Sequence, residues 1–338
     1  MKTRIAINGF GRIGRCFFRL ALQHPDFEIV AVNDLADLPT LAHLLKYDSI
    51  HGRFPESISI QNQTLQIGEK HIQFFAETHI ENLPWKQLQI DVVVESTGKF
   101  LSNELASKHL LAGAKKVLLS APPIGEGIKT IVMGVNHTKI ETTDTILSNA
   151  SCTTNNAAPI LQILDEHFGV DYAYITTIHS YTGDQRLHDS PHKDLRRARA
   201  AAVSIIPTTT GAAKAITGVF PHLHGKLGGC GMRVPVPNGS LSDISCTVRT
   251  DTTTEEVNRI FKEAALNRFP GILEYTEDPI VSVDIIDNSH SCIFDAGLTS
   301  VLGRMVKVVG WYDNEWGYSN RLVDLILFWQ NSIQTQAC

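Results

Sequence analysis

The sequence predicts two successive domains: an α/β domain with a doubly wound parallel sheet, then an α+β domain with a large mixed sheet. The length of 338 residues suits about two domains. The first half alternates strand and helix patterns, which is typical of a parallel sheet covered by helices. β-rich runs dominate the second half. We place the domains at residues 1–150 and 151–315, and expect a C-terminal helix at 316–338 that packs back on the first domain.

The elements of the first domain follow from the spacing of its apolar residues. An apolar face predicts a helix at 12–22, and we expect further helices at 41–45 and 103–112. Short apolar runs predict buried strands at 5–7, 28–32, 91–94 and 116–120. Alternation with period two predicts antiparallel strands at 57–60, 64–67 and 71–74.

The second domain begins with a polar cluster at 149–155, which is followed by a predicted helix at 156–168. Apolar and β-branched runs then predict strands at 174–178, 231–235, 241–248, 281–286, 291–296 and 306–311. The tail is again helical, at 318–330. With no low-complexity linker in the chain, we expect the two halves to pack closely.

Composition and charge argue against several classes of protein. The net charge of −5 argues against a general nucleic-acid binder, and no apolar run approaches the length of a membrane span. The N-terminal segment lacks the long apolar core of a secretory signal, so we expect a cytoplasmic protein. The six cysteines have no C-x-x-C spacing, so we expect neither a disulfide framework nor a metal site.

A glycine-rich turn, Gly9-Phe-Gly11-Arg-Ile-Gly14, follows the first strand and opens the first helix. In that context it predicts a Rossmann-type dinucleotide-binding domain. The first glycine permits the tight turn, the second lets a pyrophosphate approach the backbone, and the third allows close packing of helix on strand. The helix N-terminus at Arg12 and Ile13 favours the negative charge.

Asp34 lies at the end of the second predicted strand, two residues after Val32 and about twenty residues after the glycines. A carboxylate there can accept hydrogen bonds from both ribose hydroxyls and repels a 2′-phosphate, which favours NAD over NADP. The alternative is a glycine-rich turn beside a solvated aspartate, and the pattern alone leaves it open.

Cys152 and His179 are the candidate nucleophile and base. Cys152 precedes a predicted helix, whose dipole would lower the pKa of the thiol and favour the thiolate. His179 ends an apolar strand, and an imidazole beside a thiolate can stabilise it and later accept a proton. The polar cluster also suits a plain helix cap, and one histidine among 14 is ordinarily structural. Spacing alone leaves both interpretations open.

Long motifs, in order along essentially the whole chain, resemble those of the glyceraldehyde-3-phosphate dehydrogenase family. They are INGFGRIGR (7–15), HLLKYD (43–48), SNASCTTN (148–155), HSYTGDQ (179–185), DLRRARA (194–200), IPTTTGAAK (206–214), RVP (233–235) and WYDNE (311–315).

The resemblance implies phosphorylating oxidation of glyceraldehyde 3-phosphate to 1,3-bisphosphoglycerate with NAD, a reaction of glycolysis and gluconeogenesis. Cys152 would attack the aldehyde carbon, and His179 would take the hemithioacetal proton as hydride leaves for the nicotinamide. Inorganic phosphate would then attack the thioester.

The resemblance also implies the binding residues. Two anion sites, for the substrate phosphate and for inorganic phosphate, would use Ser151, Thr153, Thr182, Arg197, Thr210, Gly211 and Arg233, which accounts for the basic stretch 193–199. NAD would contact Gly9, Gly11, Arg12, Ile13, Gly14, Asp34, Thr78, Ser120 and Asn314. Asn314 would hold the nicotinamide carboxamide, while Thr78 stands where the family usually has arginine near the adenine.

Two further departures from the family pattern concern the chemistry. Many relatives have a second cysteine four residues after the nucleophile, but Asn156 stands there and excludes a disulfide between the two positions. Ser190 replaces the bulkier residue that NAD-preferring relatives often carry, so some use of NADP stays open, although Asp34 and Pro191 favour NAD.

Two rival functions remain at this point. Erythrose-4-phosphate dehydrogenase shares the fold and chemistry, but residues 180–185 and 208–214 resemble the glyceraldehyde enzyme. A dinucleotide-binding adaptor without catalysis would not need Cys152, His179 and two anion-site arginines. The resemblance further implies a homotetramer in which the loop 181–202 reaches a neighbouring cofactor site, with no nucleic-acid or membrane partner.

Overall fold

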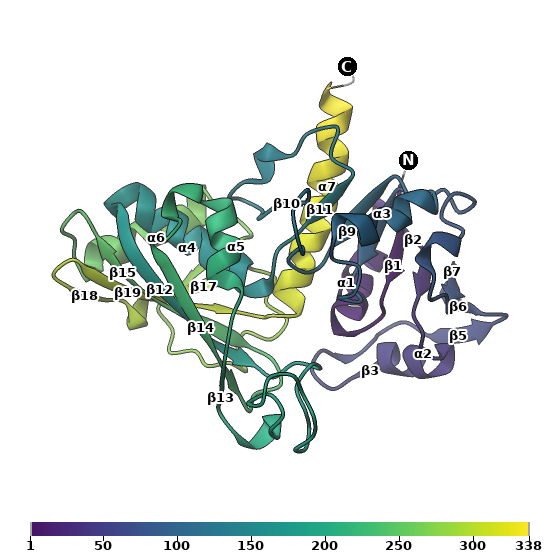
Figure 1. Cartoon of the computed structure of the whole chain (residues 1–338), viewed down its shortest axis with the longest axis horizontal. Helices are drawn as coiled ribbons and strands as arrows, with labels where there is room; N and C mark the ends of the chain where they lie inside the picture. The colour runs from purple at the N-terminus through teal and green to yellow at the C-terminus, as the bar shows by residue number, and fades with distance from the viewer. Residues whose placement is uncertain (1, 337–338) are drawn as a thin grey trace. The chain divides into compact units, whose positions relative to one another are not determined.

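The computed structural model describes residues 2–336, with side chains as far as Asn331. The chain divides into two compact units (Figure 1). Unit 1 combines Met1–Ile131, His137–Ala150 and Ser319–Cys338, and unit 2 combines Val132–Asn136 and Ser151–Tyr318. Residues 337–338 of the predicted C-terminal segment lie outside the described residues.

Unit 1 alternates strands and helices along the chain. Its elements are β1 Thr3–Asn8, α1 Arg12–Gln23, β2 Phe27–Asn33, α2 Leu38–Lys46, β3 Tyr47–Asp48, β4 Gly52–Arg53, β5 Ile58–Gln61, β6 Thr64–Ile67, β7 Lys70–Phe75, η1 Ile80–Asn82, β8 Val92–Glu95, α3 Asn103–Leu111, β9 Lys116–Leu119, β10 Lys129–Thr130, η2 His137–Lys139, β11 Ile146–Ser148 and most of α7 Trp316–Gln336.

These strands form a nine-stranded sheet in the order β10-β11-β9-β8-β1-β2-β7-β6-β5. The strands from β10 to β7 pair in parallel, and only the β5–β6–β7 end is antiparallel. The chain moves from β1 outward to β2, then returns to place β8 on the other side of β1. This reversal creates a topological switch point at the carboxyl ends of β1 and β8, where doubly wound sheets bind their ligands.

Strands β8 and β9 are buried along their whole length, as expected for parallel strands covered on both faces. Residues of α7 belong to the same unit: the Lys116 ammonium in β9 lies 4.6 Å from the centroid of the Trp329 ring and donates to the Trp329 carbonyl at 3.3 Å. No helix within the described residues is both long and apolar enough to cross a membrane.

Unit 2 contains the longer strands. Its elements are α4 Cys152–Phe168, β12 Val170–Ser180, η3 Ala201–Val203, β13 Ile206–Thr208, α5 Ala212–Val219, η4 Pro221–Leu223, β14 Leu227–Val234, β15 Ser240–Val248, α6 Thr254–Asn267, β16 Leu273–Thr276, β17 Cys292–Asp295, η5 Ala296–Leu298, β18 Ser300–Leu302 and β19 Met305–Tyr312.

Seven of these strands run in the order β13-β14-β12-β15-β19-β17-β16, and β18 pairs with β19. The sheet is mixed, because β12 is parallel to β14 but antiparallel to β15. Helix α4 contacts β12, β15 and β19, and α5 contacts β14, so helices cover one face. Both sheets together confirm the predicted fold class.

The predicted strands at 174–178 and 231–235 each start four residues after the observed β12 and β14, and two further predicted elements are wrong in extent or kind. Helix α4 begins at Cys152, four residues before the predicted start, because Ser151 rather than the following polar residues caps it. The segment 281–286 is a series of turns and not a strand. The Asp284 carboxylate accepts a hydrogen bond from the Val281 amide at 2.8 Å, and the Asp284 amide donates to the Val281 carbonyl at 3.0 Å. These bonds close a turn that leaves the Val281 and Val283 side chains exposed.

Candidate active site

Cys152 is the first residue of α4, at the end of the helix where backbone amides lack partners within the helix. The Ser151 hydroxyl caps the helix by accepting the Thr154 amide at 3.1 Å. This cap fixes the direction in which α4 starts and therefore the position of the half-buried Cys152 thiol.

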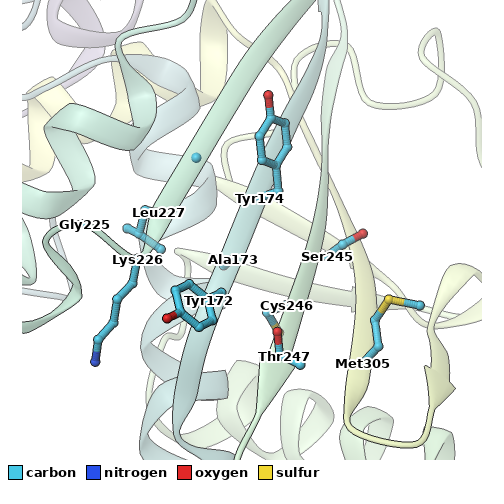
Figure 2. Close-up of a pocket in the computed structure, with 11 residues that line it drawn as sticks. Tyr172, Ala173, Tyr174, Gly225, Lys226, Leu227, Ser245, Cys246, Thr247 and Met305 are labelled. Carbon is cyan, nitrogen blue, oxygen red and sulfur yellow. The ribbon is translucent and has the colours of Figure 1, made fainter.

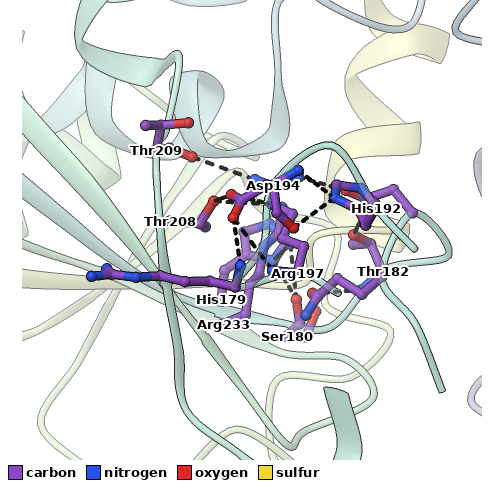
Figure 3. Close-up of polar contacts among 12 residues, drawn as sticks. His179, Ser180, Thr182, His192, Asp194, Arg197, Thr208, Thr209 and Arg233 are labelled. Carbon is purple, nitrogen blue, oxygen red and sulfur yellow. Dashed lines mark hydrogen bonds and ion pairs between the residues drawn. The ribbon is translucent and has the colours of Figure 1, made fainter. Parts of the chain in front are cut away.

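The Cys152 sulfur lies 3.5 Å from Nε2 of His179, near the end of β12. His179 pairs in register with Arg233 on the parallel strand β14. Nη1 of Arg233 lies 2.7 Å from Nδ1 of His179 and donates to the Ser180 carbonyl at 2.9 Å, as Figure 3 shows for the labelled His179, Ser180 and Arg233. The structure thus brings together the predicted nucleophile, the predicted base and one predicted anion-binding arginine.

Burial dominates the electrostatics of this pair. Burial, reinforced by the Arg233 charge, lowers the pKa of His179 to about 3, which leaves the imidazole neutral. Burial raises the pKa of Cys152, although the Arg233 charge and the Thr153 amide act in the opposite direction. The amides at the helix terminus do lower the pKa of Cys152, as predicted, but desolvation outweighs them, so the net shift is opposite to the predicted one.

Tyr312 is a buried residue of the site that the sequence analysis did not single out. Its hydroxyl lies 3.0 Å from the Thr153 hydroxyl and 2.8 Å from the Thr177 hydroxyl, and its ring meets the His179 ring edge-on at 6.0 Å between centroids. Tyr312 therefore links α4 to β12 behind the reactive pair. The only sequence signal for it was its place in the motif at 311–315.

A second polar cluster surrounds Arg197 (Figure 3). Its Nη1 donates to the Asp184 carboxylate at 2.5 Å, and its Nε donates to the Thr208 hydroxyl at 3.0 Å. The Thr182 hydroxyl donates to the same Asp184 carboxylate. The predicted residues Thr182 and Arg197 thus share one carboxylate, that of Asp184, which the sequence analysis did not single out.

Thr210 and Gly211 follow β13 and open α5. The Thr210 hydroxyl accepts the Ala212 amide at 3.3 Å, and Gly211 is the residue before the first helical turn. A Cβ atom at Gly211 would meet nothing within 4 Å, so the backbone there faces open space.

Unit 1 contains a pocket of about 370 Å³ at the switch point of its sheet. It is lined by Asn8, Gly9, Gly11, Asn33, Asp34, Leu35, Glu77, Thr78, Ile80, Ser96, Thr97, Lys99 and Phe100. The three glycines behave as their spacing predicts. Gly9 has φ +94°, a Cβ on Gly11 would meet no atom within 4 Å, and a Cβ on Gly14 would lie 2.2 Å from the Gly9 carbonyl oxygen.

The Asp34 carboxylate stands at this pocket with one backbone amide on each oxygen, from Phe10 at 2.6 Å and Ala36 at 2.9 Å. Each oxygen retains acceptor capacity for a further donor. The exposed Thr78 also lines the pocket. These groups fit a ribose and pyrophosphate, whose hydroxyls donate hydrogen bonds and whose negative charge favours the N-terminus of α1.

The other predicted cofactor residues have different surroundings. Arg12 pairs with Asp48 at 2.5 Å, and Ile13 is the second residue of α1. The Ser120 amide follows β9 and donates to the Glu95 carbonyl at 3.0 Å. Asn314 belongs to unit 2, where its Oδ1 accepts the hydroxyls of Ser180 and Ser240.

Comparison with known proteins agrees with both units. Residues 3–103 match the model of the glyceraldehyde 3-phosphate dehydrogenase NAD binding domain, and residues 151–314 match that of the C-terminal domain. The glyceraldehyde-3-phosphate dehydrogenase of Geobacillus stearothermophilus is 55% identical over 330 residues, which cover 97% of this chain and 98% of the relative. That of Streptomyces coelicolor is 55% identical over 337 residues, 98% of this chain and 100% of the relative. That of Mycobacterium avium is 53% identical over 333 residues, 96% of this chain and 98% of the relative.

A Rossmann-type unit and a cysteine–histidine site define an NAD-dependent dehydrogenase. The two relatives that are 55% identical over nearly the whole chain identify the family within this class of dehydrogenases. The chain belongs to the glyceraldehyde-3-phosphate dehydrogenase family.

Proposed function

We propose that this chain oxidises and phosphorylates glyceraldehyde 3-phosphate with NAD, using Cys152 as the nucleophile and His179 as the general base. The observation that carries the proposal is the 3.5 Å approach of Cys152 Sγ to His179 Nε2 beside Arg233. A thiol, a neutral imidazole and a guanidinium in that arrangement suit covalent chemistry on the aldehyde of an anionic substrate.

The first step forms a bond between sulfur and the aldehyde carbon. This step uses the tautomer in which Nδ1–H of His179 donates to the Ser180 carbonyl at 2.8 Å, so that the Nε2 lone pair faces Cys152. Arg233 Nη1, which can only donate, then binds the same Ser180 carbonyl at 2.9 Å and not Nδ1. Nε2 takes the thiol proton as sulfur attacks, and then returns it to the carbonyl oxygen. The product is a neutral hemithioacetal, and His179 is neutral again.

In the second step, Nε2 of His179 removes the hemithioacetal hydroxyl proton while the carbon loses hydride. Bound NAD supplies the hydride acceptor. Proton removal pushes electrons toward the carbon as hydride departs, so the carbon becomes the carbonyl of a thioester on Cys152. The neutral state of buried His179 prepares it for this role.

In the third step, an oxygen of inorganic phosphate attacks the thioester carbon. The new C–O bond forms, the C–S bond breaks, and Cys152 leaves as a thiolate that regains its proton. The thioester conserves the free energy of oxidation for this transfer, so the product is an acyl phosphate and not a free acid.

We assign the two anion sites to Ser151, Thr153, Thr182, Arg197, Thr210, Gly211 and Arg233. In support, Arg233 contacts the His179 ring, and Arg197 lies in a cluster of hydroxyls and the exposed carboxylate of Asp184. Guanidinium forks and hydroxyl donors are the groups that bind phosphate oxygens. A bound phosphate would share or replace the Asp184 carboxylate on Arg197.

We assign unit 1 to NAD binding and unit 2 to catalysis. The glycine-rich turn would hold the pyrophosphate through Gly9, Gly11, Arg12, Ile13 and Gly14. The adenosine and the adjoining portion of NAD would contact Asp34, Thr78 and Ser120. In unit 2, two serines bind the Asn314 amide oxygen. The Asn314 amide nitrogen is then the end that would donate to the nicotinamide carboxamide.

We further propose a homotetramer. The face of the unit 2 sheet opposite its helices presents Tyr172, Tyr174 and Met305 around an open pocket (Figure 2). The loop that follows β12 presents Leu187 and Leu195, which are 73% and 82% exposed. Large apolar side chains concentrated on one face and one loop are typical of subunit interfaces.

We also propose that the protein acts in the cytoplasm. In support, Cys152, Cys230, Cys246 and Cys292 form no disulfide within the described residues, and the cytosol keeps such thiols reduced.

The decisive experiment follows NADH formation from glyceraldehyde 3-phosphate, with NAD and NADP in parallel, with and without phosphate. We expect sustained turnover only with phosphate, and about one equivalent of NADH per active site without it, because the thioester then accumulates. Cys152→Ser should form no NADH but should still bind NAD. Equal turnover by this variant, or preference for erythrose 4-phosphate, would refute the assignment.

A further inference from the structure

A group of four buried polar side chains adjoins the unit 1 pocket and has no part in the proposed mechanism; two of the four, Asn8 and Asn33, line the pocket. Glu95 and His109 are completely buried, and Asn8 and Asn33 are almost so. They come from β8, α3, β1 and β2 respectively. Burying a carboxylate and an imidazole costs free energy unless their polar atoms are paired, so the partners reveal what the group holds in place.

Every contact of the Glu95 carboxylate is with a donor. Oε2 accepts from Asn8 Nδ2 at 2.5 Å and lies 3.1 Å from His109 Nε2. Oε1 accepts the Thr97 amide at 2.8 Å and also the Thr97 hydroxyl. Glu95 therefore ties α3 and β1 to the turn that follows β8.

The tautomer of His109 follows from Trp85. The indole Nε1–H can only donate, and it lies 3.0 Å from His109 Nδ1, which must accept. The ring proton of the neutral imidazole then resides on Nε2 and points to Glu95. The Trp85 indole thus orients His109 as a donor to the carboxylate.

Through Asn8, the network extends to the segment that follows β7, which also lines the pocket. The Asn8 amide oxygen accepts from Asn33 Nδ2 at 2.7 Å. Asn33 binds both backbone groups of Glu77: its Nδ2 donates to the carbonyl at 3.0 Å, and its Oδ1 accepts the amide at 2.9 Å. The residue after Glu77 is Thr78, which lines the pocket.

Four chain segments that line the pocket are therefore fixed by one buried network. They follow β1, β2, β7 and β8. The fit is tight, because a Cβ on Gly9 would lie 2.6 Å from the Thr97 amide nitrogen that Glu95 binds. A displacement of Thr97 would therefore alter the glycine turn itself.

We propose that His109 and Glu95 are positioning residues for NAD binding: they hold the glycine turn and the turns at Glu77–Thr78 and Ser96–Thr97 in their binding geometry. The inference deepens the proposed function and rests on NAD occupying this pocket. Neither residue lines the pocket, so both act through Asn8 and Thr97.

The test compares His109→Gln with His109→Leu. Glutamine can accept from Trp85 and donate to Glu95, as the assigned tautomer does, whereas leucine can do neither. We expect the Kd for NAD, measured by calorimetry without substrate, to rise roughly tenfold or more in His109→Leu and to recover largely in His109→Gln. Glu95→Gln, which places an amide donor against other donors, should behave like His109→Leu.

The kinetic signature separates positioning from general destabilisation. At saturating NAD, kcat and the KM for glyceraldehyde 3-phosphate should stay near the wild-type values in each folded variant. Ile146→Ala, in a separate apolar cluster of unit 1, is the control: it should lower the melting temperature without changing the Kd for NAD. Trp85→Phe keeps an aromatic ring in the core and removes the indole donor together with part of the ring, so it tests the network, with Ile146→Ala as the packing control, if His109→Leu does not fold.

The proposal would be overturned if His109→Leu bound NAD with the same Kd as the wild type. It would also be overturned if Trp85→Phe left the Kd for NAD unchanged and His109→Gln bound NAD no more tightly than His109→Leu. Weakening by Ile146→Ala to the same degree would also overturn it. Wild-type protein that binds no NAD would refute the proposed function instead, so the two failures are distinguishable.

Discussion

His179 has a different partner at each ring nitrogen, and this difference defines its chemistry. Nε2 faces Cys152, while Nδ1 faces the Ser180 carbonyl and Arg233. The Arg233 cation opposes a second proton on the ring, and burial acts in the same direction. His179 is therefore neutral throughout the physiological pH range, with the Nε2 lone pair available to the Cys152 thiol.

Replacement of His179 should reduce turnover without preventing NAD binding. We expect His179→Asn to lower kcat by about a hundredfold to ten-thousandfold, the usual contribution of a general base. Because the pKa of His179 is about 3, the wild-type rate should show no inflection near the ordinary histidine pKa. The residual rate of the variant should rise with pH as hydroxide replaces the lost base.

A pH-rate series of both proteins, with NADH absorbance as the signal, checks this expectation. His222→Asn is the matched control, because His222 is exposed, pairs with Asp165 and meets the Phe220 ring edge-on, and makes no contact with Cys152 or His179 in the described residues. A wild-type inflection that disappears in His179→Asn would contradict the neutral-base assignment.

At the scale of elements, the N-terminus of helix α1 is held by the segment at Asp48, which follows α2. Its first residue, Arg12, contacts the carboxylate of Asp48 in β3 at 2.5 Å. The amides of Ile50 and His51 donate to the other carboxylate oxygen. Although burial alone would raise it, these contacts lower the pKa of Asp48 to about 2.

A carboxyl group whose pKa is lower in the folded state than in the unfolded state stabilises the fold at any pH above its unfolded-state pKa. This stabilisation is lost as the pH falls through the folded-state pKa. Asp48 should therefore contribute about 2 kcal/mol at pH 7, about half as much at pH 3, and little below pH 2. We expect Asp48→Asn to lower the free energy of unfolding accordingly, as measured by urea titration at several pH values. Glu28→Gln, in the exposed pair with Arg4, should cost less than about 1 kcal/mol at every pH; equal costs for both variants would contradict the prediction.

At the scale of the whole molecule, strand β12 has two different faces. Ala173 and Ile175 are buried under the helices, whereas Tyr172 and Tyr174 point to the opposite, exposed face. In a sheet of this size an uncovered face that carries aromatic side chains is a candidate interface between copies.

Tyr174→Arg should therefore disrupt the assembly. We expect the wild type to sediment with four times the mass of the 37.3-kDa chain and the variant to sediment as a smaller species, since a buried unpaired charge is costly. Leu111→Arg, an exposed apolar position in α3, should leave the mass unchanged. A wild-type monomer, or a variant that keeps the wild-type mass, would contradict the interface.

The sequence by itself determined the fold class, the glycine turn and the family, because each depends on local spacing or on long runs of matching residues. It predicted Cys152, His179, Arg197 and Arg233 individually. Only the tertiary structure decided which of them meet: His179 and Arg233 are neighbours through the register of β12 and β14, which local patterns do not encode.

Burial was the other property that required the structure. Desolvation reversed the predicted direction of the Cys152 pKa, and turn hydrogen bonds around Asp284 overrode the apolar run at 281–286. The network of Glu95 and His109 was invisible in the sequence because its members lie in separate strands and a helix. The energetic cost of a buried charge depends on partners brought together by folding, and residue spacing along the chain does not record them.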